Sequence, residues 1–224
     1  MAEPALEWRD LKNRSDIHWA RKIWHMATVF AIFAVYQSVT PTTALVLLAI
    51  AYVICIPFDF LRLRYPQLNQ FALVIMGPLM RTHEARQTAG TTYLLTGVCV
   101  IAVLFPKPIV ALSILFLAFA DPLASYVGIR YGREKIMGHK TIQGFLAAFA
   151  VCTILAFVYL WSHEVGLSRR LVVSFIAGIT GAVAELIPVG KLDDNLTMPI
   201  LSATGLWMIF HLFGLNFMTT SDGF

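Results

Sequence analysis

Apolar and polar positions alternate along this chain in long blocks. Seven apolar runs are each close to the roughly 17–25 residues that a membrane-spanning helix needs, and they cover 23–39, 42–58, 90–105, 108–129, 142–161, 171–187 and 196–214. An eighth run, 68–80, is shorter and contains Gly77-Pro78. The pattern predicts an all-α, polytopic integral membrane protein. We expect a bundle of about seven transmembrane helices, with a short re-entrant or interfacial segment at 68–80.

Composition places the whole chain in the membrane class. Of its 224 residues, 58% are hydrophobic and 13% are charged, and the mean hydropathy is +0.72. We expect a cytoplasmic arm at 1–22, one transmembrane catalytic domain at 23–217 and a short tail at 218–224. The net charge of +4 is modest and lacks the dense basic patch that nucleic-acid binding needs. The short loops favour a bacterial inner membrane.

The Lys and Arg residues indicate whether 68–80 crosses the membrane, because cytoplasmic loops carry an excess of them. If the segment does not cross, 14 of the 17 lie inside and three outside; if it crosses, the division is 10 to 7. The first model is favoured and gives an inside N-terminus. It also places the polar islands at 81–89, 130–141 and 188–195 on the cytoplasmic face, where nucleotide is available.

The polar island Asp193-Asp194-Asn195 precedes the last apolar run. Adjacent carboxylates repel unless a cation lies between them, and Mg²⁺ binds one or two carboxylates together with phosphate oxygens. Asn195 offers a further oxygen ligand. Asp and Asn are also favoured as helix caps, but a cap needs only one such residue. Three in a row, near Lys191 and Glu185, favour metal binding.

Asp121-Pro122 lies inside an apolar run. Pro122 removes one backbone hydrogen bond and is expected to kink the helix, which frees carbonyls to line a polar cavity. A charge at this depth costs roughly 2.5–3.5 kcal/mol on insertion scales. That cost favours a metal ligand or general base over a structural Asp bonded to Ser125.

A basic, glycine-containing segment comes next. It comprises Gly128, Arg130, Gly132, Arg133, Gly138-His139-Lys140-Thr141 and Gly144. Glycines let a backbone approach phosphates, and Lys or Arg neutralises them. A Walker A loop is excluded, because His139 interrupts the Gly-Lys-Ser/Thr order and no strand is predicted before it. Basic cytoplasmic loops are common in membrane proteins, so the segment alone indicates phosphate binding only weakly.

Two further polar groups lie next to apolar runs. Glu84-Ala85-Arg86 is either an interfacial ion pair, which contributes little, or part of the site. Arg21 and Lys22 open the first span and are expected to be ordinary interface anchors. His25 lies one turn deeper, where its side chain can point into the bundle.

One ordered set of motifs spans residues 21 to 199, nearly the whole chain. It runs Arg21-Lys22-x-x-His25, Glu84, Gly90-x-x-Tyr93-x-x-x-Gly97, Asp121-Pro122-x-Ala124-Ser125-x-x-Gly128-x-x-x-Gly132, Lys140-Thr141-x-x-Gly144, Glu185 and Asp193-Asp194-Asn195-Leu196-Thr197-x-Pro199. The set resembles the polyprenol/diacylglycerol kinase family, which includes dolichol, phytol and CTP-dependent diacylglycerol kinases and is related to CDP-diacylglycerol synthase. The chain is shorter than dolichol kinases and is more similar to the compact phytol-kinase or bacterial type.

The resemblance implies a Mg²⁺-dependent lipid kinase. It would move the γ-phosphoryl group of CTP (or ATP, with CTP favoured) to the hydroxyl of diacylglycerol or of a polyprenol- or phytol-type lipid. The acceptor is expected to enter laterally between helices kinked at Pro122 and Pro78.

The resemblance also assigns roles to residues. Asp193, Asp194 and Asp121 would hold metal. The nucleotide would be bound by Gly128, Arg130, Gly132, Arg133, Lys140, Thr141 and Gly144. Asn195 would bind metal or orient the acceptor, and either Asp121 or Glu84 would take the hydroxyl proton. Additional candidates are His25, Arg86 and Glu185.

Two alternatives stay open. A CDP-lipid synthase (cytidylyltransferase) would release pyrophosphate instead of a nucleoside diphosphate, but the Gly-His-Gly-Gly run of the synthases is missing. An ion-coupled transporter would use Asp121 and Glu84 as a relay, but the chain shows no inverted repeat with paired broken helices.

Overall fold

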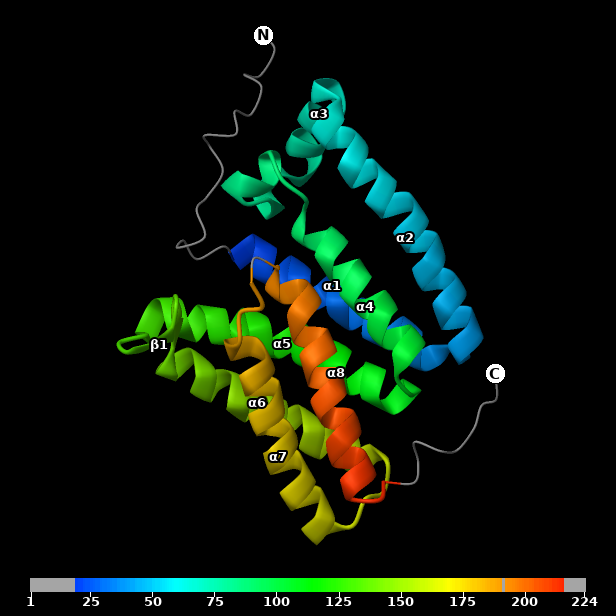
Figure 1. Cartoon of the computed structure of the whole chain (residues 1–224), viewed down its shortest axis with the longest axis vertical. Helices are drawn as coiled ribbons and strands as arrows, with labels where there is room; N and C mark the ends of the chain where they lie inside the picture. Colours follow the sequence, from blue (N-terminus) through cyan, green and yellow to red (C-terminus); the bar gives the residue numbers. More distant parts are fainter. Residues whose placement is uncertain (1–18, 191, 216–224) are drawn as a thin grey trace.

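The computed structural model of the chain describes residues 19–190 and 192–215. Its longer helices are α1 (Trp19–Ser38), α2 (Pro41–Arg64), α3 (Pro66–Met76), α4 (Gly90–Leu104), α5 (Lys107–Tyr131), α6 (Ile142–Ser162), α7 (Leu167–Leu186) and α8 (Asp194–Leu212). Figure 1 shows α2 along one edge of an elongated bundle, with α3 near one end and α6 and α7 toward the other.

The predicted helical membrane class is confirmed. Each of the seven apolar runs coincides with a helix, and α2, α5, α6 and α7 are long and apolar enough to cross a membrane. Helix α4 is apolar but shorter. Seven crossings therefore stay a prediction. The predicted arm at 1–22 falls mostly outside the described residues, as do Lys191 and the tail at 218–224, but α1 already begins at Trp19.

The short apolar run at 68–80 forms helix α3 and the 3₁₀ turn η2 (Gly77–Leu79), and a second 3₁₀ turn, η3 (Thr82–Ala85), follows. Helix α3 has 11 residues, which at 1.5 Å per residue span only about 16 Å. That length is too short to cross a bilayer core of about 30 Å. Around Leu73, Met80 and Ala85 the segment has a small apolar cluster of its own.

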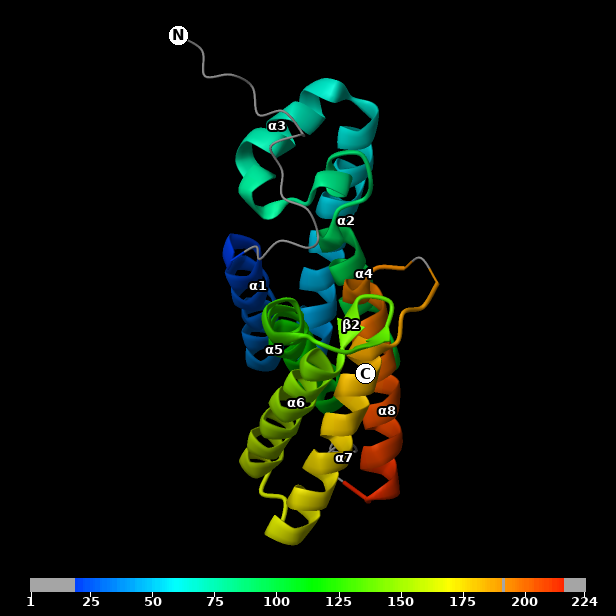
Figure 2. The same ribbon diagram turned by 90° about the vertical axis from the view of Figure 1, so that its left-hand side faces the viewer.

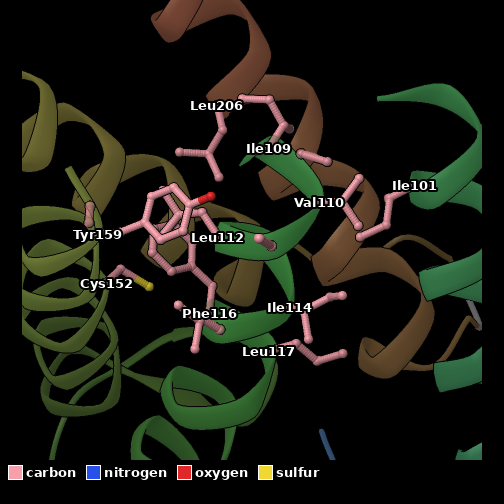
Figure 3. Close-up of a cluster of buried hydrophobic side chains, with 14 of the residues drawn as sticks. Ile101, Ile109, Val110, Leu112, Ile114, Phe116, Leu117, Cys152, Tyr159 and Leu206 are labelled. Atoms are coloured by element: carbon pink, nitrogen blue, oxygen red, sulfur yellow. The ribbon is translucent and has the colours of Figure 1, made fainter. Parts of the chain in front are cut away.

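Helix α5 is the centre of the main core and packs against α1, α6, α7 and α8. Its first half is buried on every side, from Ile109 to Ala118. Figure 3 shows Leu112, Phe116 and Leu117 of this run among side chains of the neighbouring helices. A helix that is apolar all round is expected to be surrounded by other helices, so the polar residues at its far end are held in a rigid frame.

Close packing of α6 on α7 depends on small residues. A Cβ atom at Gly181 would lie 2.5 Å from Cys152 Sγ and 2.8 Å from the Phe116 ring, and one at Gly178 would overlap Thr153. Small residues let membrane helices approach closely. Figure 2 shows α6, α7 and α8 running side by side away from the end that carries α3.

A β-hairpin joins α5 to α6. Strand β1 (Lys135–Met137) pairs antiparallel with β2 (Lys140–Thr141), and Gly138 between them has φ +57°. The expectation that no strand precedes Gly138 was therefore wrong. The exclusion of a Walker A loop still holds, because that loop connects a strand directly to a helix, whereas this strand turns back on its neighbour.

Candidate active site

The polar islands meet in one cavity of about 590 Å³. It lies where the N-terminal ends of α1, α6 and α8 approach the C-terminal ends of α5 and α7, beneath the hairpin. The acids that line it are Asp121, Glu185, Asp193 and Asp194, and the bases include Arg21, Lys22, Arg81, Arg133 and Lys140. Helix N-termini carry partial positive charge and favour anions, so three of them at one cavity suit a polyanionic ligand.

Lys140 bridges two acids across this cavity. Its Nζ donates to Glu185 Oε1 at 2.6 Å and to Asp194 Oδ2 at 3.1 Å. Burial alone would lower the pKa of Lys140, but the carboxylates of Glu185, Asp194 and Asp121 outweigh it and raise the pKa above its ordinary value. The ammonium therefore stays charged, and β2 fixes its position next to both acids.

The island at the start of α8 has both a structural and a site-lining role. Asp193 caps the helix, accepting a hydrogen bond from the Asn195 backbone N–H at 3.0 Å. Burial raises the pKa of Asp193, and the adjacent Asp194 raises it further, while the hydrogen bond from Asn195 opposes the rise. Asn195 is itself buried, and its Nδ2 approaches the Gly90 carbonyl at 3.4 Å. The capping role is thus confirmed for Asp193, and it leaves the metal assignment open.

Asp121 faces cations contributed by several elements. Electrostatic interactions link it to His25, Lys140, Arg81 and Lys22. His25 Nε2 donates to the Leu117 carbonyl at 3.1 Å, one turn before the acid. The surrounding charges compensate the cost of this carboxylate inside an apolar helix.

Lys22 also belongs to the site, which corrects the expectation that it is an interface anchor. Its Nζ donates to Ser125 Oγ at 2.8 Å and to the Pro122 carbonyl at 3.2 Å. That carbonyls freed by the proline line the cavity stays a prediction, because the carbonyl bonded by Lys22 is that of Pro122 itself. Helix α5 nonetheless continues through Pro122 without interruption.

Glu84 is buried, and both of its carboxylate oxygens accept hydrogen bonds. It accepts from Arg21 at 2.6 and 2.9 Å, from the Arg81 backbone N–H at 2.7 Å and from the Gly90 backbone N–H at 2.9 Å. Burial would raise the pKa of Glu84, but the hydrogen bonds and positive charge of Arg21 outweigh it, so the pKa lies below its ordinary value. Its partner is thus Arg21 from α1, another residue first interpreted as an anchor.

The glycines of the basic segment mainly allow close packing. A Cβ atom at Gly144 would lie 2.9 Å from the Ala124 carbonyl, and one at Gly128 would lie 3.1 Å from Thr141 Oγ1. Gly132 is more crowded still, by the Thr141 side chain and the Gly128 carbonyl. Thr141 caps α6 and accepts from the Gly144 backbone N–H. These residues line the cavity and hold the hairpin against α5.

Two candidates lie away from the cavity. Arg130 and Arg86 are exposed, and neither belongs to the lining of the charged cavity. By contrast, the exposed Arg133 does line it. Of the candidate nucleotide-binding residues, the structure therefore separates Arg130 from the others, which line the cavity.

Sequence analysis missed a buried network beside the site. Arg62 donates to Asp59 at 2.7 Å and to the Glu84 and Gln87 carbonyls, each at 2.9 Å. Asp59 also accepts from Thr92 Oγ1 at 2.6 Å. Through these bonds, α2 holds the loop that contains Glu84 in place. An Asp and an Arg three residues apart in an apolar run are a detectable signal of such a pair, but Asp59 and Arg62 were not among the predicted site residues.

Metal binding is left as a prediction. Within residues 19–190 and 192–215, no three His, Cys, Asp or Glu side chains form a metal-binding group. Mg²⁺ does not require one, because it keeps several waters and binds one or two carboxylates plus substrate phosphates. Asp193 and Asp194 line the cavity and fit that requirement.

A charged cavity cut into a bundle of apolar helices is typical of a membrane enzyme with a charged substrate. Comparisons with known proteins point the same way. CTP-dependent diacylglycerol kinase 1 of Schizosaccharomyces pombe is 29% identical over 215 residues, which cover 91% of this chain and 98% of that protein. The protein of the same name in Saccharomyces cerevisiae is 27% identical, over 82% of this chain and 70% of its own length. Dolichol kinase of Saccharomyces cerevisiae is 24% identical over 84% of this chain, but only 36% of that kinase is covered.

These matches confirm the resemblance: the chain is a relative of the polyprenol and diacylglycerol kinases. The Schizosaccharomyces pombe protein is covered almost in full, whereas the expected similarity to the compact phytol-kinase or bacterial type stays a prediction. A link to CDP-diacylglycerol synthase stays a prediction. No family model matches the chain, and no solved structure matches it.

Proposed function

We propose that this chain is a lipid kinase that transfers the γ-phosphoryl group of CTP to the hydroxyl of a membrane lipid alcohol, with Mg²⁺, at the cytoplasmic face. The observation that carries the proposal is the charged cavity, which brings acids and bases from distant parts of the chain to three helix N-termini. Kinship with CTP-dependent diacylglycerol kinases supports the choice of donor and acceptor class.

The bases and helix N-termini would bind the triphosphate. Lys140 and Arg133 line one side of the cavity, and Arg21, Lys22 and Arg81 line it from other elements. Catalysis of phosphoryl transfer depends mainly on positioning and on neutralising charge. Lys140 is already held between Glu185 and Asp194, so an entering phosphate would compete with these acids for its ammonium.

The residues at the start of α8 fit a magnesium site. Asp193 and Asp194 would hold the ion, with Asp121 as a further candidate ligand. An ion held there would supply positive charge to neutralise the phosphates of the nucleotide. These adjacent, half-buried carboxylates, with a raised pKa at Asp193, would gain from a cation beside them.

Of the two candidate bases, Asp121 is favoured. Glu84 accepts four hydrogen bonds from Arg21, Arg81 and Gly90, so its carboxylate oxygens are already occupied by protein donors. Asp121 lines the cavity instead. In the transfer, the bond between the γ-phosphorus and its bridging oxygen breaks and a bond to the lipid oxygen forms. Asp121 takes the hydroxyl proton, and CDP leaves.

The test uses purified protein in detergent with γ-³²P-labelled CTP or ATP and Mg²⁺. The acceptor panel contains diacylglycerol, undecaprenol, dolichol and phytol, with phosphatidic acid as the synthase control. We expect Mg²⁺-dependent labelling of a lipid alcohol from CTP. Loss of this activity in Asp194→Ala, but not in Glu134→Ala, is expected because Glu134 is an exposed acid outside the cavity. Absence of labelled lipid from the whole panel would refute the proposal.

A further inference from the structure

A second cavity, also of about 590 Å³, lies between α1, α2, α3 and α4. Its size falls within the range of roughly 300–1,000 Å³ seen for small-molecule sites. Most of its lining is apolar and includes Val29, Leu48, Ala51, Met76 and Leu95. The phosphoryl-transfer residues do not account for this space.

Several polar side chains in its wall are already bonded to protein groups. Asp59 and Arg62 pair with each other, Thr92 donates to Asp59, and Glu84 is held by Arg21. Thr28 donates to the Trp24 carbonyl of its own helix. A water in such a space needs two to four polar partners, so hydrocarbon matches this wall better than water does.

The inner end of the apolar cavity adjoins the charged one. Arg21, His25 and Asn195 line both. Gly90 lies at the same junction, where a Cβ atom would come within 2.9 Å of Arg21 Nη2 and 3.0 Å of Asn195 Nδ2. His25 also interacts electrostatically with Asp121. The junction is therefore beside the favoured base.

The outer side of the cavity faces the surroundings of the bundle. Trp24 and Val35 of α1 and Leu47 of α2 line it, yet they are 51%, 48% and 43% exposed. For a helix bundle in a bilayer, these exposed apolar side chains contact lipid. Lateral access between α1 and α2 would differ from the route first expected between Pro122 and Pro78, which stays a prediction.

We infer that the apolar cavity between α1, α2, α3 and α4 holds one hydrocarbon chain of the lipid alcohol, and that its hydroxyl reaches Asp121 through the junction of Arg21, His25 and Asn195. This inference rests on the proposed kinase function and adds to it the place where the acceptor binds. The lipid enters from the bilayer between α1 and α2, while the nucleotide enters the charged cavity from the aqueous side. The two substrates thus meet at the junction, where Arg21, His25 and Asn195 line both cavities.

The kinetic test fills the cavity with a large side chain. Ala51 of α2 lines the cavity, whereas Ala49 of the same helix is exposed and does not. On α1, Ala31 lines the cavity and Ala34 does not, although both are exposed. We expect Ala51→Trp and Ala31→Trp to raise KM for the lipid about tenfold or more, with KM for CTP changed less than about twofold. Ala49→Trp and Ala34→Trp should leave both values unchanged.

A binding measurement complements the kinetics. Wild-type protein is photolabelled with a diacylglycerol that carries a diazirine at the end of one acyl chain, and the labelled peptides are mapped. We expect labels on α1 and α2 in the wild type and their loss in Ala51→Trp. Unchanged lipid KM in both cavity-filling variants of an active enzyme, or labels confined to other helices, would overturn the inference. A wild type that transfers no phosphoryl group but is labelled on α1 and α2 would refute the kinase function alone.

Discussion

Asp121 and Glu84 are both acids in apolar surroundings, and their neighbours differ. Glu84 is bonded by Arg21 and by the backbone N–H groups of Arg81 and Gly90. Asp121 interacts with His25, Lys140, Arg81 and Lys22 by charge, across a cavity. A carboxylate with its lone pairs occupied holds structure together, whereas one facing a cavity can accept a proton from a substrate.

Replacing Asp121 tests this division of roles. We expect Asp121→Asn to lower kcat by at least about 10²-fold, the usual contribution of a positioned general base. CTP binding should persist, because Lys140 and Arg133 are unchanged. Steady-state kinetics and CTP-binding titration of the purified variant measure both quantities. Wild-type turnover in Asp121→Asn would exclude it as the base.

The lowered pKa of Glu84 implies that the stability of the folded protein depends on pH. Its pKa in the folded protein lies below the ordinary value of 4.5, so its ionised form stabilises the fold above that pH. The stabilisation is lost as the pH falls through the lower, folded-state pKa. We expect Glu84→Gln to lower the apparent Tm in detergent near pH 7, and the gap to wild type to shrink below pH 4.5. A gap that is constant over this range would contradict the ion-pair account.

Much of the site could be predicted at the level of single residues, because acids are costly in apolar runs and therefore conspicuous. Asp121 was found in this way, Asp194 by its adjacent carboxylate and Lys140 by its basic, glycine-containing segment, and the structure brings all three to one cavity. Arg21 and Lys22 were misjudged, because a basic residue at a helix end is usually an anchor. Only the fold shows that α1 packs against α5 and brings these bases inward.

At the scale of elements, apolar run length was sufficient to locate the helices from α1 to α8. The hairpin was missed because β1 and β2 have only three and two residues, too few to show a pattern. The loop that carries η3 depends on long-range bonds to α2 through Arg62 and Asn69. Those bonds have no local sequence signature.

Arg62 of α2 bonds to Asp59 and to the carbonyls of Glu84 and Gln87. The stability of the loop between α3 and α4 is therefore expected to depend on Arg62. Removing one partner of a buried ion pair typically costs about 3–5 kcal/mol, because the other charge is left unpaired. We therefore expect Arg62→Ala to lower the apparent Tm and to increase proteolysis in the loop between α3 and α4. The double variant Asp59→Asn, Arg62→Ala should recover part of the loss. Arg64→Ala, on the exposed end of the same helix, serves as the control and should be near neutral.

For the whole molecule, two cavities of equal volume meet at Arg21, His25 and Asn195. One is charged and lies at helix ends, and the other is apolar and lies among helix sides. This arrangement accommodates a water-soluble donor and a membrane-soluble acceptor in one small bundle. Residue charges predicted the first cavity. The second was not predicted, because an apolar cavity depends on how α2 is placed relative to α1 and α4.

The predicted topology can be tested by accessibility. Glu134→Cys and Arg169→Cys place single cysteines in exposed segments before and after α6, in a background where Cys55, Cys99 and Cys152 are replaced by Ala. An impermeant maleimide added to intact cells should label position 169, and position 134 only after permeabilisation. Labelling of both from the same side would contradict the topology.

The central claim is that the γ-phosphoryl group moves to a lipid alcohol. It is tested most directly by parallel reactions with CTP labelled at the γ- or the α-phosphorus, with diacylglycerol and with phosphatidic acid. We predict that only the γ-label enters lipid, in diacylglycerol reactions, with one CDP formed per lipid phosphorylated. Incorporation of the α-label from reactions with phosphatidic acid, with release of pyrophosphate, would show a cytidylyltransferase and contradict the kinase assignment.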